Sequence, residues 1–137
     1  MNLFFFSRPA RPDNFYAQLK TLLKDTIRDA KTRNLIGAAL LANLAVWAGG
    51  IFVNVRTSEE VIALHHNVYF GITLIGSPRQ LYLIPLLGLF VIAANLVISR
   101  LTRRRDNFFI YLFSGASLTA QFFLLLGIGS VILINFR

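Results

Sequence analysis

The chain has no cysteine and little charge. Among its 137 residues are 14 Lys and Arg but only 6 Asp and Glu, so charged side chains make up 15% of the chain. Without cysteine, it can form neither a disulfide framework nor a thiolate metal site. Soluble domains normally carry charge on about a quarter of their residues. This deficit excludes an ordinary soluble globular domain.

Three long runs contain no Asp, Glu, Lys, Arg or His: residues 34–55, 80–99 and 107–136. A helix crosses a hydrocarbon core about 30 Å thick with roughly 20 apolar residues. Buried soluble helices are the alternative, but the rest of the chain is too short to give three of them a polar covering. We therefore predict an all-α integral membrane protein with three transmembrane helices in a domain spanning residues 34–137.

The basic residues divide unevenly between the two ends of these spans. Eleven of them precede the first span or lie between the second and third, whereas Arg56, Arg79 and Arg137 fall on the other side. The excess of Lys and Arg on cytoplasmic loops predicts a cytoplasmic N-terminus and an outside C-terminus. The net charge of +8 is thus explained by orientation and by contact with anionic lipid headgroups, and we expect no nucleic-acid partner.

Residues 1–33 are predicted to form a cytoplasmic arm with an amphipathic helix. Asp13 can cap its first turn, and apolar residues then recur at helical spacing on one face. They are Phe15, Leu19, Leu22, Leu23, Ile27 and Ala30. Two interpretations remain open: an interfacial helix on lipid, or a docking helix for another subunit.

Two sets of residues mark faces of the predicted spans. Small residues form a stripe along the first span, which permits close approach of a neighbouring helix in lipid. This stripe consists of Ala38, Ala42, Ala45 and Gly49. Neutral polar residues occur in all three spans and are expected to meet as interhelical hydrogen bonds. They are Asn43, Asn95, Ser114, Ser117 and Gln121. The alternative is that they line a polar substrate path.

Charged residues and His are missing from every predicted span. Proton-coupled transporters, voltage sensors and haem-binding bundles need ionisable or ligating groups at membrane depth. The chain also has no Ser–His–Asp, Walker or dinucleotide-binding motif. We therefore expect no enzymatic activity, no cofactor and no metal.

The loop between the first two spans carries contradictory local signals. Thr57 and Glu60 have capping-box spacing, which predicts a short helix extending as far as Asn67. Apolar and polar residues then alternate over residues 66–74, which predicts extended chain. The extended stretch would lie on the membrane surface or pack over the helix ends.

The same loop supplies a candidate outside surface made of His65, His66, Tyr69 and Phe70. Tyr69 and Phe70 suit the aromatic belt at the membrane interface. Adjacent His residues on extended chain point in opposite directions, and zinc normally needs three or four protein ligands. A structural or headgroup-contacting role is therefore favoured over a metal site.

The loop also carries a recognisable run, His66-Asn-Val-Tyr-Phe-Gly-Ile-Thr-Leu-Ile-Gly76, followed by Leu81-Tyr-Leu-Ile-Pro-Leu-Leu-Gly88. It resembles a group of small uncharacterised multi-pass membrane proteins from bacterial genomes, whose outside loop has a similar HxN[IV]YFGIxLIG run. The resemblance implies the membrane topology and brings no activity with it. With the charge asymmetry, it predicts residence in the bacterial cytoplasmic membrane.

The features together predict a non-catalytic accessory or scaffolding subunit of a larger membrane protein complex. Its expected partners are membrane lipids, including anionic headgroups, and other membrane protein subunits. The alternative is a homo-oligomeric transport or binding module that uses the neutral polar residues as its path.

Overall fold

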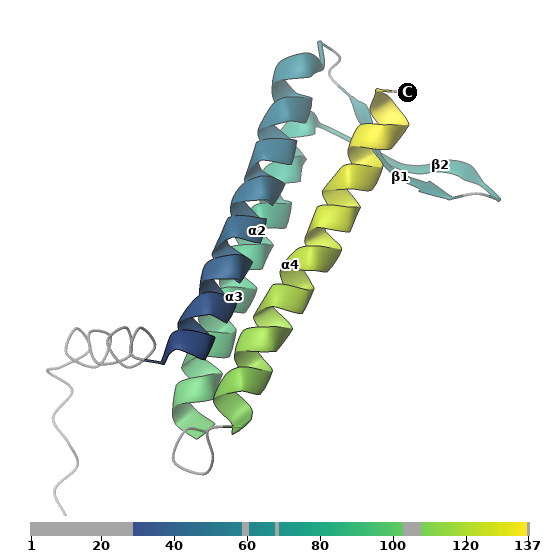
Figure 1. The fold of residues 1–137 in the computed structure, drawn as a ribbon. Helices are drawn as coiled ribbons and strands as arrows, with labels where there is room; N and C mark the ends of the chain where they lie inside the picture. Colours follow the sequence, from purple (N-terminus) through teal and green to yellow (C-terminus); the bar gives the residue numbers. More distant parts are fainter. Residues whose placement is uncertain (1–28, 59–60, 68, 103–107, 137) are drawn as a thin grey trace, which may run out of the picture.

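The computed structural model describes residues 29–58, 61–67, 69–102 and 108–136. Three long helices, α2 (Ala30–Arg56), α3 (Leu83–Thr102) and α4 (Phe108–Asn135), pack side by side as a bundle (Figure 1). A hairpin of β1 (Ile62–Asn67) and β2 (Gly71–Gly76) leaves one end of this bundle, and a 3₁₀ helix, η1 (Pro78–Tyr82), leads from it into α3. The amphipathic helix expected in the arm lies outside the described residues.

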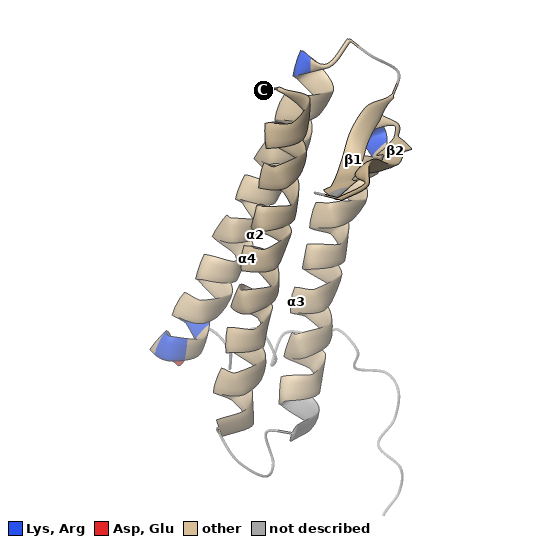
Figure 2. Cartoon of the chain, turned by 90° about the vertical axis from the view of Figure 1, so that its right-hand side faces the viewer, with Lys and Arg blue, Asp and Glu red and all other residues tan. Residues whose placement is uncertain are grey.

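Within the described part of the chain, three helices are long and apolar enough to cross a membrane, as the charge-free runs predicted. The candidate spans cover Ala30–Arg56, Pro78–Ser99 and Phe108–Asn135, each beginning or ending within a few residues of the charge-free runs. At about 1.5 Å per residue, the 27 residues of α2 extend about 40 Å. The described charged residues lie at the ends of the bundle and leave its length free of charge (Figure 2).

Helix α2 begins at a defined cap. The carboxylate of Asp29 accepts hydrogen bonds from the Thr32 amide at 3.0 Å and from the Thr32 hydroxyl at 2.5 Å. These bonds stabilise the charged form, so Thr32 lowers the pKa of Asp29 below its ordinary value. The cap lies at the end of the bundle where α3 ends and α4 begins (Figure 1).

The loop between α2 and α3 differs from its prediction. The expected helix reaching Asn67 is wrong, because Ile62–Asn67 is a strand that pairs antiparallel with Gly71–Gly76. Gly71 has a φ of 74°, a left-handed conformation that glycine adopts readily, and it lies where the chain turns back. Cross-strand pairing therefore overrides the local capping signal, and the described part of the chain is a helical bundle with a hairpin rather than purely α.

A small apolar core joins the hairpin to the bundle. It consists of Val46, Val53, Ile62, Leu81, Ile128 and Val131. Leu81 belongs to η1, which starts at the Ser77 cap with Pro78 in its first turn. The ring of Tyr82 stacks on Trp47 of α2 with 5.7 Å between centroids. These contacts hold the base of the hairpin against α2 and α4.

Candidate functional site

The centre of the bundle contains a hydrogen-bonded pair of side-chain amides. The Nδ2 atom of Asn43 on α2 donates to Oε1 of Gln121 on α4 at 3.0 Å, and also to the carbonyl of Pro85 at 3.0 Å. Nε2 of Gln121 donates to the carbonyl of Gly88 on α3 at 2.9 Å. Both side chains are buried, with Gln121 fully so. This pair therefore joins all three helices at one level.

A second polar contact connects α3 and α4 closer to the end of the bundle where α3 ends and α4 begins. Nδ2 of Asn95 donates to the hydroxyl of Ser117 at 3.0 Å, and that hydroxyl donates to the Phe113 carbonyl at 3.0 Å. Ser114 is buried on the same face of α4. The structure thus brings Asn43 together with Gln121 and Asn95 together with Ser117, in two separate contacts rather than at the single meeting point expected for the five polar residues.

The small residues of α2 lie beside its buried seam rather than within it. The seam consists of Thr32, Ile36, Ala39, Asn43, Val46, Gly50 and Val53. Successive residues of a helix are about 100° apart, so a stripe that is offset by one residue from the seam faces to one side of the contact between the helices. Gly49 does approach α4, since a Cβ there would lie 2.9 Å from Ile128 Cγ1, whereas Ala38 and Ala42 are half-buried and Ala45 is exposed.

Two further asparagines, which the sequence analysis did not single out, attach the hairpin and η1 to the helices. Asn135 at the end of α4 accepts from the Ala63 amide at 3.0 Å and donates to the Ala63 carbonyl at 2.8 Å. Asn54 near the end of α2 donates to the carbonyl of Pro78 at 2.8 Å. Polar residues are common at helix ends, so neither asparagine stands out in the sequence. Its role becomes visible only from the partner that it bonds to, which lies far away along the chain.

The predicted outside surface lies on the hairpin. His65 and His66 are exposed, and the Nδ1 atom of His65 is 2.7 Å from the Thr73 hydroxyl. Tyr69 and Phe70 lie at its tip with 91% and 82% of their surfaces exposed. Among the described residues, no three His, Cys, Asp or Glu side chains come together as metal ligands. The hairpin therefore presents an apolar surface with two imidazoles.

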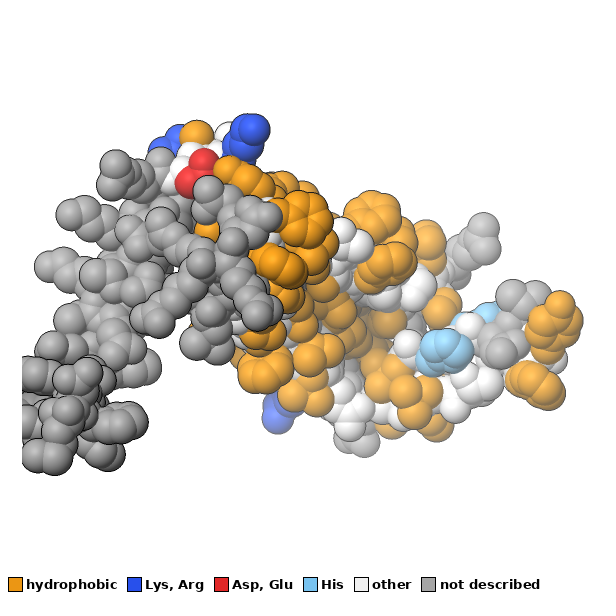
Figure 3. Space-filling view, turned by 90° about the horizontal axis from the view of Figure 1, so that it is seen from below, with side chains coloured by type: hydrophobic (Ala, Val, Ile, Leu, Met, Phe, Trp, Pro, Cys, Tyr) orange, Lys and Arg blue, Asp and Glu red, His pale blue; other side chains and the backbone are white. Residues whose placement is uncertain are grey.

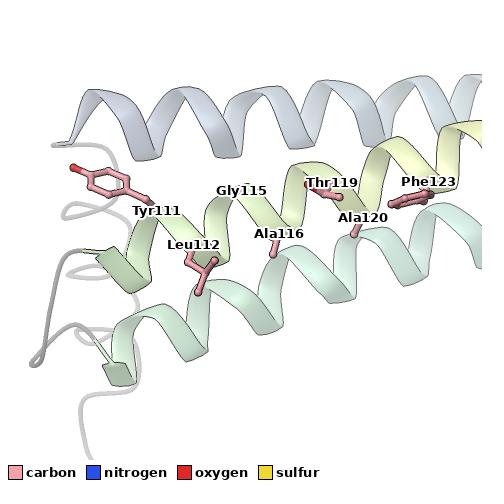
Figure 4. Close-up of a pocket in the computed structure, with 7 residues that line it drawn as sticks. All are labelled: Tyr111, Leu112, Gly115, Ala116, Thr119, Ala120 and Phe123. Carbon is pink, nitrogen blue, oxygen red and sulfur yellow. The ribbon is translucent and has the colours of Figure 1, made fainter.

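A shallow hollow runs along the outer face of α4 (Figure 4). Its floor is made by Gly115, Ala116, Thr119 and Ala120, and larger side chains close its two ends: Tyr111 and Leu112 at one, Phe123 at the other. A Cβ added at Gly115 would meet no atom within 4 Å. We call these seven residues the α4 groove; most of them are turned away from the buried residues of the same helix.

Buried polar side-chain atoms in the described part of the chain all have hydrogen-bond partners. The buried amides of Asn43 and Gln121 are therefore engaged with each other and with backbone carbonyls. Comparisons with family models, curated proteins and solved structures give no match for this chain. Its function is therefore argued from this geometry.

Proposed function

We propose that this chain is a non-catalytic accessory or scaffolding subunit of a membrane protein complex, and that a partner helix docks in the α4 groove. The observation that carries the proposal is the small-residue floor of that groove on the outer face of a spanning helix. In lipid, helices associate mainly by close packing, which small residues permit. Large apolar residues cover much of the remaining outer surface of the bundle.

The polar residues favour this function over transport. A solute path needs polar groups that can exchange partners with the solute. Asn43, Gln121, Asn95 and Ser117 instead bond to each other across the helices. Their arrangement is suited to fixing the packing of the bundle, on which a docking face depends.

The proposed setting is the bacterial cytoplasmic membrane, with the Asp29 end of the bundle on the cytoplasmic side. Lys31 and Arg33 lie at that end, and they belong to the eleven basic residues that precede the first span or lie between the second and third. Anionic headgroups would contact them, and Lys31 Nζ lies 6.0 Å from the centroid of the Tyr111 ring at the start of the groove.

The absence of native cysteine makes a site-specific test possible. Ala116→Cys and Ala120→Cys place single thiols in the groove, and Ala93→Cys places one on the exposed surface of α3 as a matched control. Each variant is labelled with a thiol-reactive benzophenone in native membranes and irradiated, and its adducts are identified by mass spectrometry. A partner helix in the groove predicts the same membrane protein at both groove positions but not at position 93.

A packing variant then tests whether that contact matters. Gly115→Leu fills the groove floor in space that is otherwise open, so it should abolish co-purification of the captured partner while leaving the bundle folded. Adducts consisting only of a second copy of this chain would favour the homo-oligomeric alternative. Equal capture from positions 93, 116 and 120 would contradict docking at the groove.

A further inference from the structure

The hairpin leaves the bundle sideways near the last turns of α4 (Figure 1), and in the view turned by 90° it lies above the start of α3 at the same level (Figure 2). Its base is fixed there, because Asn135 holds Ala63 through two hydrogen bonds. Leu133, one turn or less from Asn135, is 66% exposed on the outer surface of the bundle. The strands therefore begin level with the end of the apolar span rather than above it.

The outer part of this hairpin is apolar. Residues 62–76 contain no Asp, Glu, Lys or Arg. Phe70, Ile72, Leu74 and Ile75 each expose more than half of their surface. Seen from the opposite end of the bundle, hydrophobic side chains extend beyond the helices at the hairpin tip (Figure 3). An apolar patch of this kind normally contacts lipid or protein.

We propose that the tip of the β1–β2 hairpin inserts into the headgroup region of the bilayer and anchors this end of the bundle to lipid. The apolar patch lies at the same height along the bundle as the exposed apolar surface at the end of α4. Since that surface would face lipid, lipid is the favoured contact for the patch as well. Arg56 is the last residue of α2 and Arg79 lies at the start of the second candidate span, and both side chains are exposed. Lipid phosphates would contact them at this level of the bilayer.

The depth of insertion follows from the backbone. The sheet of the described residues has two strands, so β2 keeps one edge whose amide and carbonyl groups need water or another partner. Hydrocarbon would leave these groups unsatisfied at several kcal/mol each, whereas the headgroup region supplies water. Aromatic residues such as Tyr69 and Phe70 are enriched at that depth. The tip therefore lies at the interface and not within the hydrocarbon core.

Anchoring would also restrain the helices. A spanning helix takes its tilt and rotation from neighbouring helices and from interfacial side chains. Because Asn135 joins the hairpin to α4, lipid contact at the tip restrains the rotation of α4 about its axis. This role is independent of the proposed partner helix, since the groove and the hairpin are separate surfaces.

Tryptophan fluorescence in liposomes tests the insertion. The chain has one tryptophan, Trp47, so the full-length Trp47→Phe/Phe70→Trp variant reports from the tip alone. It is reconstituted into phosphatidylethanolamine and phosphatidylglycerol bilayers with bromine atoms near the headgroups or near the middle of the acyl chains. Trp47→Phe/Phe122→Trp is the control, because Phe122 is exposed midway along α4.

Interfacial insertion predicts blue-shifted emission at position 70 and a larger loss of intensity with shallow than with deep bromines. The control should show the reverse order. Full quenching by acrylamide without bromine quenching would place the tip in water and overturn the proposal. Stronger quenching by deep bromines would overturn it in favour of insertion into the hydrocarbon core. Bromine quenching that disappears as the protein-to-lipid ratio rises would overturn it in favour of contact with a second copy of the chain. Trp47→Phe/Tyr69→Trp provides the same readout where the first variant does not fold.

Discussion

The side-chain amide nitrogen of Asn43 lies 3.0 Å from the side-chain oxygen of Gln121, although 78 residues separate the two along the chain. Each amide also bonds to a backbone carbonyl of α3, at Pro85 and Gly88. Interhelical hydrogen bonds in membranes average only about 0.6 kcal/mol. Their main contribution is therefore to fix which faces of the three helices meet.

Gln121→Leu should destabilise the bundle modestly. The substitution nearly preserves side-chain volume but removes the bonds to Asn43 and to the Gly88 carbonyl, at a combined cost of about 1 kcal/mol. The measurement is the free energy of unfolding in mixed detergent micelles. Ser130→Ala is the control, since that exposed hydroxyl donates to the Gly127 carbonyl of its own helix. Equal stability of the two variants would show that the amide pair contributes nothing.

Gly88→Ala should be more damaging than its size suggests. A Cβ at Gly88 would overlap Nδ2 of Asn43 and would lie 2.6 Å from Oε1 of Gln121. Overpacking of this kind costs about 1 to 3 kcal/mol, which exceeds the gain of up to about 1 kcal/mol from replacing glycine in a helix. The same unfolding measurement applies.

Gly127→Ala is the matched control for that variant. A Cβ there meets no atom within 4 Å, so only the gain in helix propensity should remain and the protein should be as stable as the parent or more so. If Gly88→Ala behaved in the same way, the close approach of α3 to the amide pair would be refuted.

Much of the bundle could be predicted from the sequence, because lipid imposes simple rules. Absence of charge marks the spans, and the i, i+3, i+7 spacing of Ser114, Ser117 and Gln121 places them on one face of a helix. The small-residue stripe was less informative. Small residues permit close packing of helices but do not require it. The face of α2 that is buried is the neighbouring one, which contains the polar Asn43.

The hairpin shows why the rest could not be predicted. The capping-box spacing of Thr57 and Glu60 is a local signal, whereas the pairing of Ile62 with Gly76 depends on residues 14 positions apart in the chain. The partners of Asn54 and Asn135 lie 24 and 72 residues away. Such long-range contacts have no periodic signature in the sequence.

The cap of α2 should respond to acid. Hydrogen bonds from Thr32 hold the pKa of Asp29 below its ordinary 3.8, so the charged form stabilises the folded helix. For a lowered pKa, this stabilisation is present above pH 3.8 and is lost as the pH falls through the lower, folded-state pKa. The NMR shift of the Thr32 amide proton should therefore titrate with a midpoint below that value.

Asp29→Asn is the control for this titration. Asparagine is also a good N-cap but carries no titrating group, so the helix should remain capped and the low-pH transition of the Thr32 amide should disappear. A wild-type midpoint at or above 3.8 would contradict the stabilisation of the charged carboxylate.

Asn135→Ala should loosen the hairpin without unfolding the bundle. The variant loses both side-chain bonds to Ala63 and leaves that residue's amide and carbonyl dependent on water. Two bonds of modest strength amount to about 1.4 kcal/mol, so hydrogen exchange of the Ala63 amide should accelerate about tenfold.

Asn34→Ala, at an exposed position near the start of α2, should leave that rate unchanged. Asn54→Ala removes the bond to Pro78 instead, so it should affect the Ala63 amide less than Asn135→Ala does. If Ala63 exchanged at the parental rate in the Asn135 variant, strand pairing alone would hold the hairpin, and lipid contact at its tip could not be transmitted to α4 through this side chain.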